Sequence, residues 1–412
     1  MVNVVEKVQV VENLPKGWKW ARLGDVCNTT SGGTPSRGNA SYYGGGIPWV
    51  KSGELTDGDV FKTSEKITQE GLNNSSAKLF PSGTLLIALY GATVGKLGIL
   101  QMEAATNQAV CAIFPNELVL KDFLFFHLLS CREDLLEISF GGAQPNISQN
   151  IIRDLIIPLP PLPEQKRIVG ILSDRLTAID KARIATEAQL KAAKALPAAY
   201  LRQVFDSPEA QKWKRKKFGD IALTVQNGVY KSSEYYGHGY PFIRMYNIQN
   251  TSWNLNLDTL AQVSLDDHEL EKFRLEVGDL LISRVNSFEL VGKCGLVSSM
   301  AKGYVFENML IRVQLIDSID SLFVAQQMGH CTIRKQVQGV AKQAIGQASI
   351  NSTDIRNIEL MLPSFSEQRT ISAKINKALE QVEKLQQSLQ SQLTTINQLP
   401  AVILRQAFNG EL

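Results

Sequence analysis

The sequence predicts an α+β protein in which two mixed α/β globular segments are separated by two long antiparallel helices. Three observations lead to this prediction. The chain repeats itself with an offset of about 200 residues. Each repeat ends in a long stretch whose apolar residues have helical spacing. Each repeat begins with short β-rich runs that are separated by glycine-rich turns.

The repeat is clearest at the ends of the two halves. LPAAYLRQVF at 196–205 returns as LPAVILRQAF at 399–408, with seven identical positions and an offset of 203. A Glu-Gln pair followed by a basic residue, at 164–166 and 367–369, has the same offset. Such internal repeats indicate duplicated structural units. We expect globular segments at 1–157 and 211–362, with helical segments at 158–210 and 363–412.

The globular segments match less closely, but their elements correspond. The runs Thr84–Ala88 and Asp279–Ser283 predict equivalent buried strands. Residues 120–137 have the helical spacing of a buried face, which explains their aromatic residues without a ligand.

The helical segments predict a coiled coil. Apolar residues at 371–399 step by alternating fours and threes, with one polar position at Gln392. The weaker row at 168–196 includes Arg175 and Gln189. Because each helix must bury its apolar row, we expect the two to pair antiparallel about a pseudo-twofold axis. The predicted contact residues of this helix pair are Ile168, Leu172, Ile179, Leu196, Ile371, Ile375, Val382, Leu385, Leu389 and Ile396.

Prolines mark the borders of these segments. The run Pro158–Pro163 predicts a stiff linker before the first helix, and Pro363 begins the corresponding linker in the second half. Pro197 and Pro400 stand at equivalent points and are expected to kink or end their helices.

Composition limits the class of protein. The 412 residues carry 43 Lys and Arg against 40 Asp and Glu, a net charge of +3, so nucleic-acid binding would need a local basic patch. The five cysteines are scattered, which argues against disulfides and a structural zinc site. Residues 1–7 lack the features of a signal peptide, and no apolar run is long enough to span a membrane. We expect a cytoplasmic protein without membrane contact.

Motifs of catalysis are missing from the sequence. Gly91–Leu97 is one residue short of a phosphate-binding loop and has Leu97 where a magnesium-binding Ser or Thr should stand. No dinucleotide fingerprint, adenine-methyltransferase motif or hydrolase motif occurs. His330 and Cys331 are adjacent, but two neighbouring ligands do not make a tetrahedral metal site, so ordinary packing is expected. The sequence predicts no catalytic residue and no metal ligand.

Binding chemistry is present at corresponding places in both halves. A loop at 31–46 is rich in glycine and hydroxyl groups, and 227–233 is its counterpart. Arg and Lys can bond to guanine edges, and Asn to adenine. A flexible polar turn would also explain each loop, as a solvated edge would explain the basic run Lys212–Lys217. The DNA-contact candidates are Thr34, Ser36, Arg37, Tyr43, Lys51, Lys96, Asn227, Tyr230, Lys231, Arg244, Tyr246, Asn247 and Lys293.

These features together strongly resemble the specificity subunit of type I restriction-modification enzymes. The resemblance covers nearly the whole chain, and its most specific parts are Pro163–Ile168 and Leu404–Leu412. At the second junction, Ser364–Arg369 lacks the second proline. The resemblance implies that each globular segment is a target recognition domain for one half of a bipartite double-stranded DNA site.

The resemblance also implies what the partners supply. The helices would set the spacer and dock two modification subunits, which bring S-adenosylmethionine and methylate adenine at N6. Restriction subunits would add ATP- and Mg-dependent translocation and cleavage, so that this chain would need no cofactor. Two alternatives are a protein-binding scaffold without DNA specificity and a self-contained methyltransferase or nuclease.

Overall fold

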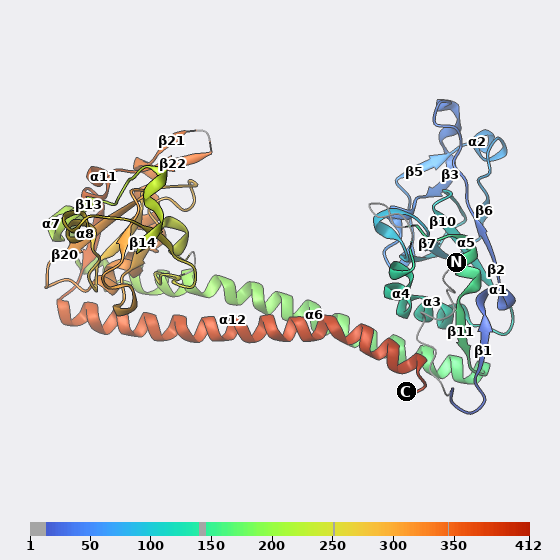
Figure 1. Cartoon of the computed structure of the whole chain (residues 1–412). Helices are drawn as coiled ribbons and strands as arrows, with labels where there is room; N and C mark the ends of the chain where they lie inside the picture. The colour runs from blue at the N-terminus through green and yellow to red at the C-terminus, as the bar shows by residue number, and fades with distance from the viewer. Residues whose placement is uncertain (1–13, 140–145, 250–251, 345) are drawn as a thin grey trace. The chain divides into compact units, whose positions relative to one another are not determined.

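The computed structural model of the chain describes residues 14–139, 146–249, 252–344 and 346–412 (Figure 1). The described residues form two compact units. Unit 1 extends to Thr186 and also includes Gln392–Leu412, whereas unit 2 is Glu187–Ser391. Among the described residues, no helix combines the length and the apolar character that crossing a membrane requires. The segment 1–7, in which we expect no signal peptide, lies outside the described residues.

Unit 1 carries head 1, residues 19–159, which has two main sheets. The five-stranded sheet has the order β2-β10-β7-β8-β4, and the four-stranded sheet has the order β5-β3-β9-β6. A separate pair joins the two ends of the head, because β1 is antiparallel to β11. The elements of head 1 are β1 Lys19–Arg22, α1 Leu23–Val26, β2 Cys27–Ser31, β3 Tyr43–Val50, β4 Gly58–Val60, β5 Glu65–Ile67, α2 Gln69–Asn73, β6 Leu79–Phe80, β7 Leu85–Ala88, β8 Leu97–Leu100, β9 Ala104–Thr106, β10 Val110–Pro115, α3 Lys121–Ser130, α4 Arg132–Glu137, α5 Gln149–Asp154 and β11 Ile156–Leu159.

Strand β7 shows why the apolar run at 84–88 forms a central strand. Leu85 and Ile87 point into a core that also contains Leu124 of α3. Leu86 and Ala88 point to the opposite face and join a second core. A strand buried on both faces needs continuous apolar residues rather than alternation. The predicted strand is therefore confirmed, and so is its counterpart β16 at Leu280–Ser283.

Unit 2 carries head 2, residues 214–362. In its described residues, head 2 repeats most of the element order of head 1 but lacks counterparts of β4 and β6 and adds β17, β21 and β22. Its main sheet has the order β13-β20-β16-β18, and β15-β14-β19 form a second sheet. Strand β12 pairs with β23 as β1 pairs with β11. The elements of head 2 are β12 Lys214–Lys217, α7 Phe218–Ile221, β13 Ala222–Asn227, β14 Tyr236–Ile243, β15 Ala261–Val263, α8 Asp267–Phe273, β16 Leu280–Ser283, β17 Val285–Asn286, β18 Cys294–Leu296, β19 Val305–Phe306, β20 Leu310–Leu315, α9 Ser321–Met328, α10 Cys331–Val340, β21 Lys342–Ala344, β22 Gln347–Ser349, α11 Ser352–Arg356 and β23 Glu359–Leu362.

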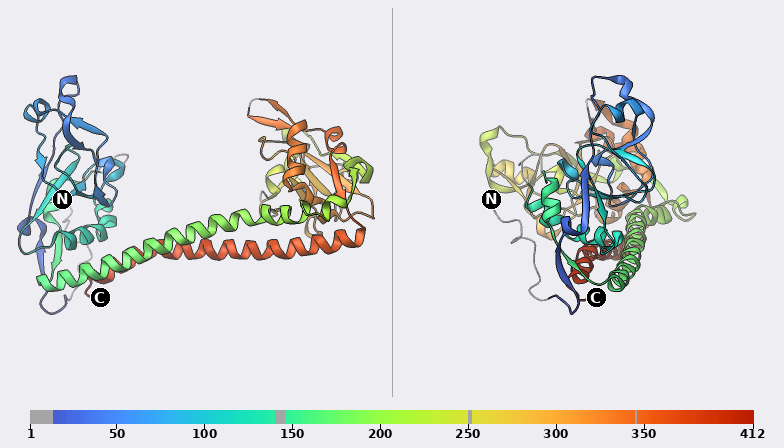
Figure 2. Two further views of the ribbon diagram at one scale, coloured as in Figure 1. Left: turned by 180° about the vertical axis from the view of Figure 1, so that it is seen from behind. Right: turned by 90° about the vertical axis from the view of Figure 1, so that its right-hand side faces the viewer.

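Two 44-residue helices are shared by the units (Figure 2). Helix α6, Leu162–Phe205, begins in unit 1 and ends in unit 2, and α12, Phe365–Phe408, does the reverse. In unit 1, Arg167 donates to the carbonyl of Leu412 at 2.6 Å. In unit 2, Gln386 donates to the carbonyl of Ala193 at 2.9 Å. Each unit thus contains a contact between the α6 part of the chain and the part at or beyond α12.

The prolines do not end the helices, although an end at each proline was one of the two predicted outcomes. Pro197 and Pro400 lie inside α6 and α12, and neither helix ends there. The expected stiff linker at 158–163 is also wrong in part, because Pro158 and Leu159 belong to strand β11. This strand pairs with β1, so hydrogen bonds as well as prolines fix the start of α6.

The buried row of α12 is shifted from the predicted one at every second position. Ile375, Val382 and Leu389 are buried as expected. Leu385, however, is 45% exposed, and Gln386 takes its place. Leu393 likewise replaces Gln392 as the partly buried residue. At these positions the buried side chain therefore belongs to the residue after the one that apolar spacing predicted.

Helix α6 is shifted in the same way. The positions of Ile168 and Leu172 are buried, and Ile179 is partly buried. Where the prediction had Arg175 and Gln189, the next residues, Leu176 and Leu190, line the buried face instead. Arg175 and Gln189 themselves are exposed. The remaining predicted contacts, Leu196, Ile371 and Ile396, are partly buried.

The repeated motifs hold the helices on the heads. The amide of Gln165 donates to the carbonyls of Leu118 and Pro160 and accepts from the N–H of Leu120, at 2.8–2.9 Å. Gln368 contacts Asp320 and Pro363 in the same way. Both glutamines are buried, which explains why an amide follows the Glu in each repeat.

The second repeated motif packs the helix ends. Leu404 and Phe408 of α12 join a core with Phe123 of head 1. Leu201 and Phe205 of α6 join the core of head 2. Each head is therefore held by the start of one helix and the end of the other.

We predict that Leu389→Glu destabilises unit 2 by about 3 kcal/mol or more, because it places an unpaired carboxylate in a buried apolar position. Urea unfolding would measure the change. Leu385→Glu is the matched control and should cost less than about 0.5 kcal/mol, since its side chain faces solvent. Equal destabilisation by both changes would contradict the shifted row.

We also predict that Gln165→Ala destabilises unit 1 by about 2–3 kcal/mol, because backbone groups of residues 118 and 120 lose their buried partners. Thermal unfolding of Gln165→Ala against Lys166→Ala, at the next and exposed position, would test this. Similar melting temperatures for the two variants would show that the amide is not an anchor.

Candidate nucleic-acid interface

The loop after β2 is held against head 1 by two glycines. A Cβ atom at Gly32 would overlap Thr106, and one at Gly33 would overlap the backbone of Ala77. Only glycine can approach so closely, so the backbone of the loop is fixed at this point. The following residues, Ser36 and Arg37, are exposed.

Arg37 is positioned by two aromatic rings and one carboxylate. Its guanidinium carbon lies 4.5 Å from the ring centroid of Tyr43 and 5.1 Å from that of Trp49. Its Nη1 donates to Glu65 at 2.7 Å. The Tyr43 hydroxyl donates to the carbonyl of Pro35, which ties the ring to the same loop. Because 55% of the Arg37 side chain remains exposed, a positively charged group is presented to solvent in a fixed place.

Glu65 on strand β5 joins this arginine to a second cation. Lys51, which follows β3, donates to the other oxygen of Glu65 at 2.7 Å. The hydrogen bonds from Arg37 and Lys51 hold the pKa of the Glu65 carboxyl below its usual range. The carboxylate therefore stays charged and offsets part of the local positive charge.

Head 2 has a similar arrangement from different positions. Arg244 follows β14, donates to Glu307 at 3.1 Å and lies 5.4 Å from the ring centroid of Tyr246. Glu307 is buried and also accepts from the N–H of Met245. This pairing raises the pKa of Arg244 above its usual value. Each head thus presents an arginine that lies beside a tyrosine ring and pairs with a carboxylate.

A second cation lies at the loop of head 2. Lys231 contacts Glu269 at 2.5 Å, and its Nζ lies 4.8 Å from the ring centroid of Tyr235. Tyr230 is 78% exposed, and Asn227 is exposed too. In head 1, the Thr34 hydroxyl is engaged by Gln108. The loops therefore offer aromatic, amide and basic groups on their surfaces.

Three sequence candidates have structural partners that change their roles. Asn247 is buried, and its amide binds the N–H of Arg244 and the carbonyls of Asn256 and Thr259. We therefore leave it out of the proposed contacts. Lys96 pairs with Asp57 at 2.7 Å, and Lys293 donates to a backbone carbonyl at 2.6 Å. Burial lowers the pKa of Lys293.

Sequence reasoning missed Glu65 and Glu307. They are 28 and 63 residues away from the arginines that they contact, and no periodicity connects them. Within the basic run at 212–217, residues Lys214–Lys217 form the exposed strand β12 at the border of head 2.

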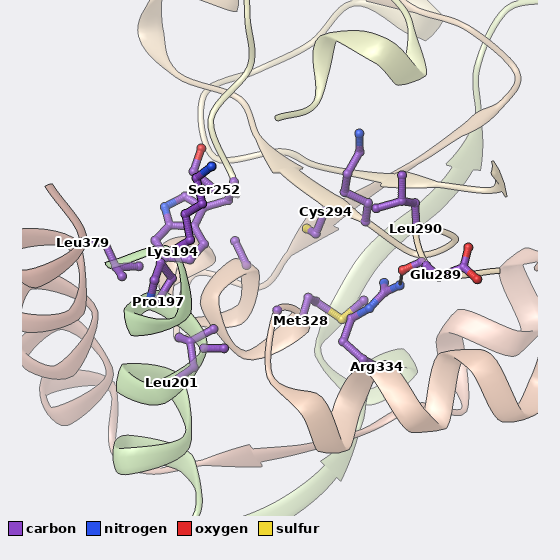
Figure 3. A pocket seen from close by; sticks show the side chains of 15 residues that line it. Lys194, Pro197, Leu201, Ser252, Glu289, Leu290, Cys294, Met328, Arg334 and Leu379 are labelled. Carbon is purple, nitrogen blue, oxygen red and sulfur yellow. Dashed lines mark hydrogen bonds between the residues drawn. The ribbon is translucent and has the colours of Figure 1, made fainter. Parts of the chain in front are cut away.

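Unit 2 also contains a cavity of about 280 Å³ that is lined by α6, α12 and head 2 (Figure 3). Leu201, Leu290 and Met328 make its walls largely apolar. Burial raises the pKa of its Cys294 thiol to about 12, so the cavity offers no thiolate nucleophile. Arg334 at its edge donates to the carbonyl of Glu289 at 2.6 Å. This chemistry favours packing over catalysis.

Comparison with solved structures shows a shared fold. One similar chain belongs to a structure of the assembly and conformational transition of a type I restriction-modification system, with a TM-score of 0.75, 23% identity, and coverage of 97% of this chain and 100% of the other. The HsdS subunit from Thermoanaerobacter tengcongensis gives a TM-score of 0.66 and 23% identity, with 97% and 98% coverage.

Comparison of sequences leads to the family. The type I restriction enzyme EcoKI specificity subunit from Escherichia coli (strain K12) is 24% identical over 97% of this chain and 90% of its own length. The StySPI specificity subunit from Salmonella potsdam has the same identity and coverage. The family model described as "Type I restriction modification DNA specificity domain" matches residues 15–192 and 210–396. The chain therefore belongs to the type I restriction modification DNA specificity family.

Proposed function

We propose that this chain is the DNA-recognition subunit of a type I restriction-modification complex and carries no catalytic site of its own. The observation that carries the proposal is the tandem match: a DNA specificity domain occurs once on each head. The heads share most of their element order, but their exposed loop residues differ. Two similar folds with different surfaces are suited to reading two different half-sites.

The exposed cations supply the chemistry for this task. Arg37 and Arg244 stand beside aromatic rings at the surfaces of the heads. Arginine makes bidentate bonds to guanine edges, and lysine contacts phosphates. The proposed contacts are Thr34, Ser36, Arg37, Tyr43, Lys51, Asn227, Tyr230, Lys231, Arg244 and Tyr246. Lys96 and Lys293 are left out of this set, because Lys96 pairs with Asp57 and Lys293 donates to the carbonyl of Ile248.

The shared helices would set the spacer between the half-sites. A straight helix of 44 residues is about 66 Å long at 1.5 Å per residue. Each unit has a contact between the two helical segments of the chain, and these contacts support the pairing. We propose that exposed faces of these helices dock two modification subunits, which bind S-adenosylmethionine and methylate adenine. Restriction subunits would bring ATP- and magnesium-dependent chemistry. The cytoplasmic location of the protein stays a prediction.

Head exchange tests the proposal directly. Replacing residues 20–155 by the corresponding segment of another specificity subunit, and expressing the hybrid with the modification subunits, should change one half of the methylated site only. Mapping of modified adenines would measure this, with exchange of residues 214–362 as the reciprocal control. A hybrid that changes both halves, or unchanged methylation, would argue for a scaffold without DNA specificity.

Glu65 and Arg37 should have opposite effects on DNA binding. Arg37→Ala should weaken or relax recognition of one half-site by about 1–3 kcal/mol. Glu65→Gln leaves two cations without their carboxylate, so non-specific affinity should rise and the salt dependence should steepen by roughly one to two phosphate contacts. Titration of the assembled complex with specific and random duplexes at several salt concentrations would measure both. Glu70→Gln, on the exposed surface of α2, makes the same charge change and should have little effect.

A further inference from the structure

One cluster of side chains in unit 2 has no part in the proposed DNA contacts. It lies where the end of α6 meets the start of α10. Asp206 is the residue after Phe205, the last residue of α6. His330 is the N-cap of α10, and Cys331 is its first residue. The adjacent pair alone suggested packing, but the fold adds a third metal-binding side chain from far away in the sequence.

The spacing of the three ligand atoms suits a tetrahedral metal ion. Nε2 of His330 lies 3.1 Å from Oδ1 of Asp206 and 3.6 Å from Sγ of Cys331. All three ligand atoms lie within 4.8 Å of one another. In a tetrahedral zinc site with bonds of 2.0–2.3 Å, ligand atoms are about 3.3–3.8 Å apart. The two measured separations, 3.1 and 3.6 Å, lie close to this range.

Burial differs among the three residues in a way that favours binding. His330 is 1% exposed, and its ring lies 5.5 Å from the ring of Phe205, so its direction is fixed. Asp206 and Cys331 are exposed, so an ion can enter from solvent. A thiolate and a carboxylate together carry two negative charges, which a divalent cation balances.

The other head shows that the fold does not require this trio. Phe123 of head 1 stacks on Phe408 as Phe323 of head 2 stacks on Phe205. Counted from these phenylalanines, head 1 has Ser130 and Cys131 at the positions of His330 and Cys331. Asn409 follows Phe408 where Asp206 follows Phe205. Head 1 nevertheless has a histidine in this place, since the ring of His127 lies 4.8 Å from that of Phe408 and its Nε2 lies 3.5 Å from Sγ of Cys131. The carboxylate of Asp206 is thus the ligand by which unit 2 differs from unit 1.

We propose that Asp206, His330 and Cys331 form a binding site for a divalent transition metal of the zinc class, with water as the fourth ligand. Among the described residues, Nδ1 of His330 has no hydrogen-bond partner. A ligating histidine without such outer support binds metal about 10–100 times more weakly. The site should therefore fill at higher zinc concentrations than a structural site, and a bound ion ties the end of α6 to α10.

Cys331 makes the proposal testable on the full chain. The other four cysteines, Cys27, Cys111, Cys131 and Cys294, are buried, and burial raises the pKa of each of these thiols to about 12. A thiol reagent should react first with Cys331. Zinc should slow this reaction at least tenfold in the native chain prepared without a histidine tag. Cobalt(II) should give one equivalent of thiolate-to-metal charge-transfer absorption.

Two matched variants separate metal binding from general charge effects. Asp206→Asn keeps the shape of the side chain and should need at least tenfold more zinc for the same protection. Glu209→Gln, an exposed change three residues away, should behave like the native chain. Cys331→Ser should lose the cobalt absorption while its circular dichroism spectrum stays native. The proposal is overturned if zinc gives no protection, or if Asp206→Asn and the native chain respond equally.

Discussion

The structure depends on how the ends of α6 and α12 are buried. At each helix start, one buried glutamine satisfies backbone groups of the adjacent head. At each helix end, a leucine and a phenylalanine enter the core of a head. A long helix cannot bury its apolar face alone, so these contacts and the antiparallel partner stabilise it together. The most closely repeated parts of the sequence are the parts that make these contacts.

How much the sequence could predict depends on whether a feature arises from neighbouring or from distant residues in the chain. The repeat and the continuous apolar run of β7 depend on neighbours along the chain, and both predicted the structure correctly. The buried rows were shifted because Leu385 is more apolar than Gln386, although Gln386 is the residue that binds the facing helix. Periodicity reports apolar residues and cannot report a buried amide that is satisfied by a distant carbonyl.

Long-range pairing limited the prediction of the interface more strongly. The residue types at Arg37 and Arg244 indicated binding chemistry, but their partners could not be inferred. Asn247 seemed equally suitable for reading adenine, yet it forms a local cap inside head 2. Its counterpart in head 1 is Glu54, which binds the N–H of Lys51. A charged or amide side chain next to a strand end can therefore bind a backbone N–H group as readily as it can bind a ligand.

The division of the chain into units also affects synthesis on the ribosome. Unit 1 needs residues 392–412, which are translated after the whole of unit 2. The contact between Arg167 and Leu412 spans 245 residues. Head 1 and the start of α6 emerge first, but the core around Phe123 is completed only by Leu404 and Phe408, which emerge last. During this interval, the nascent chain exposes a patch for which chaperones and aggregation compete.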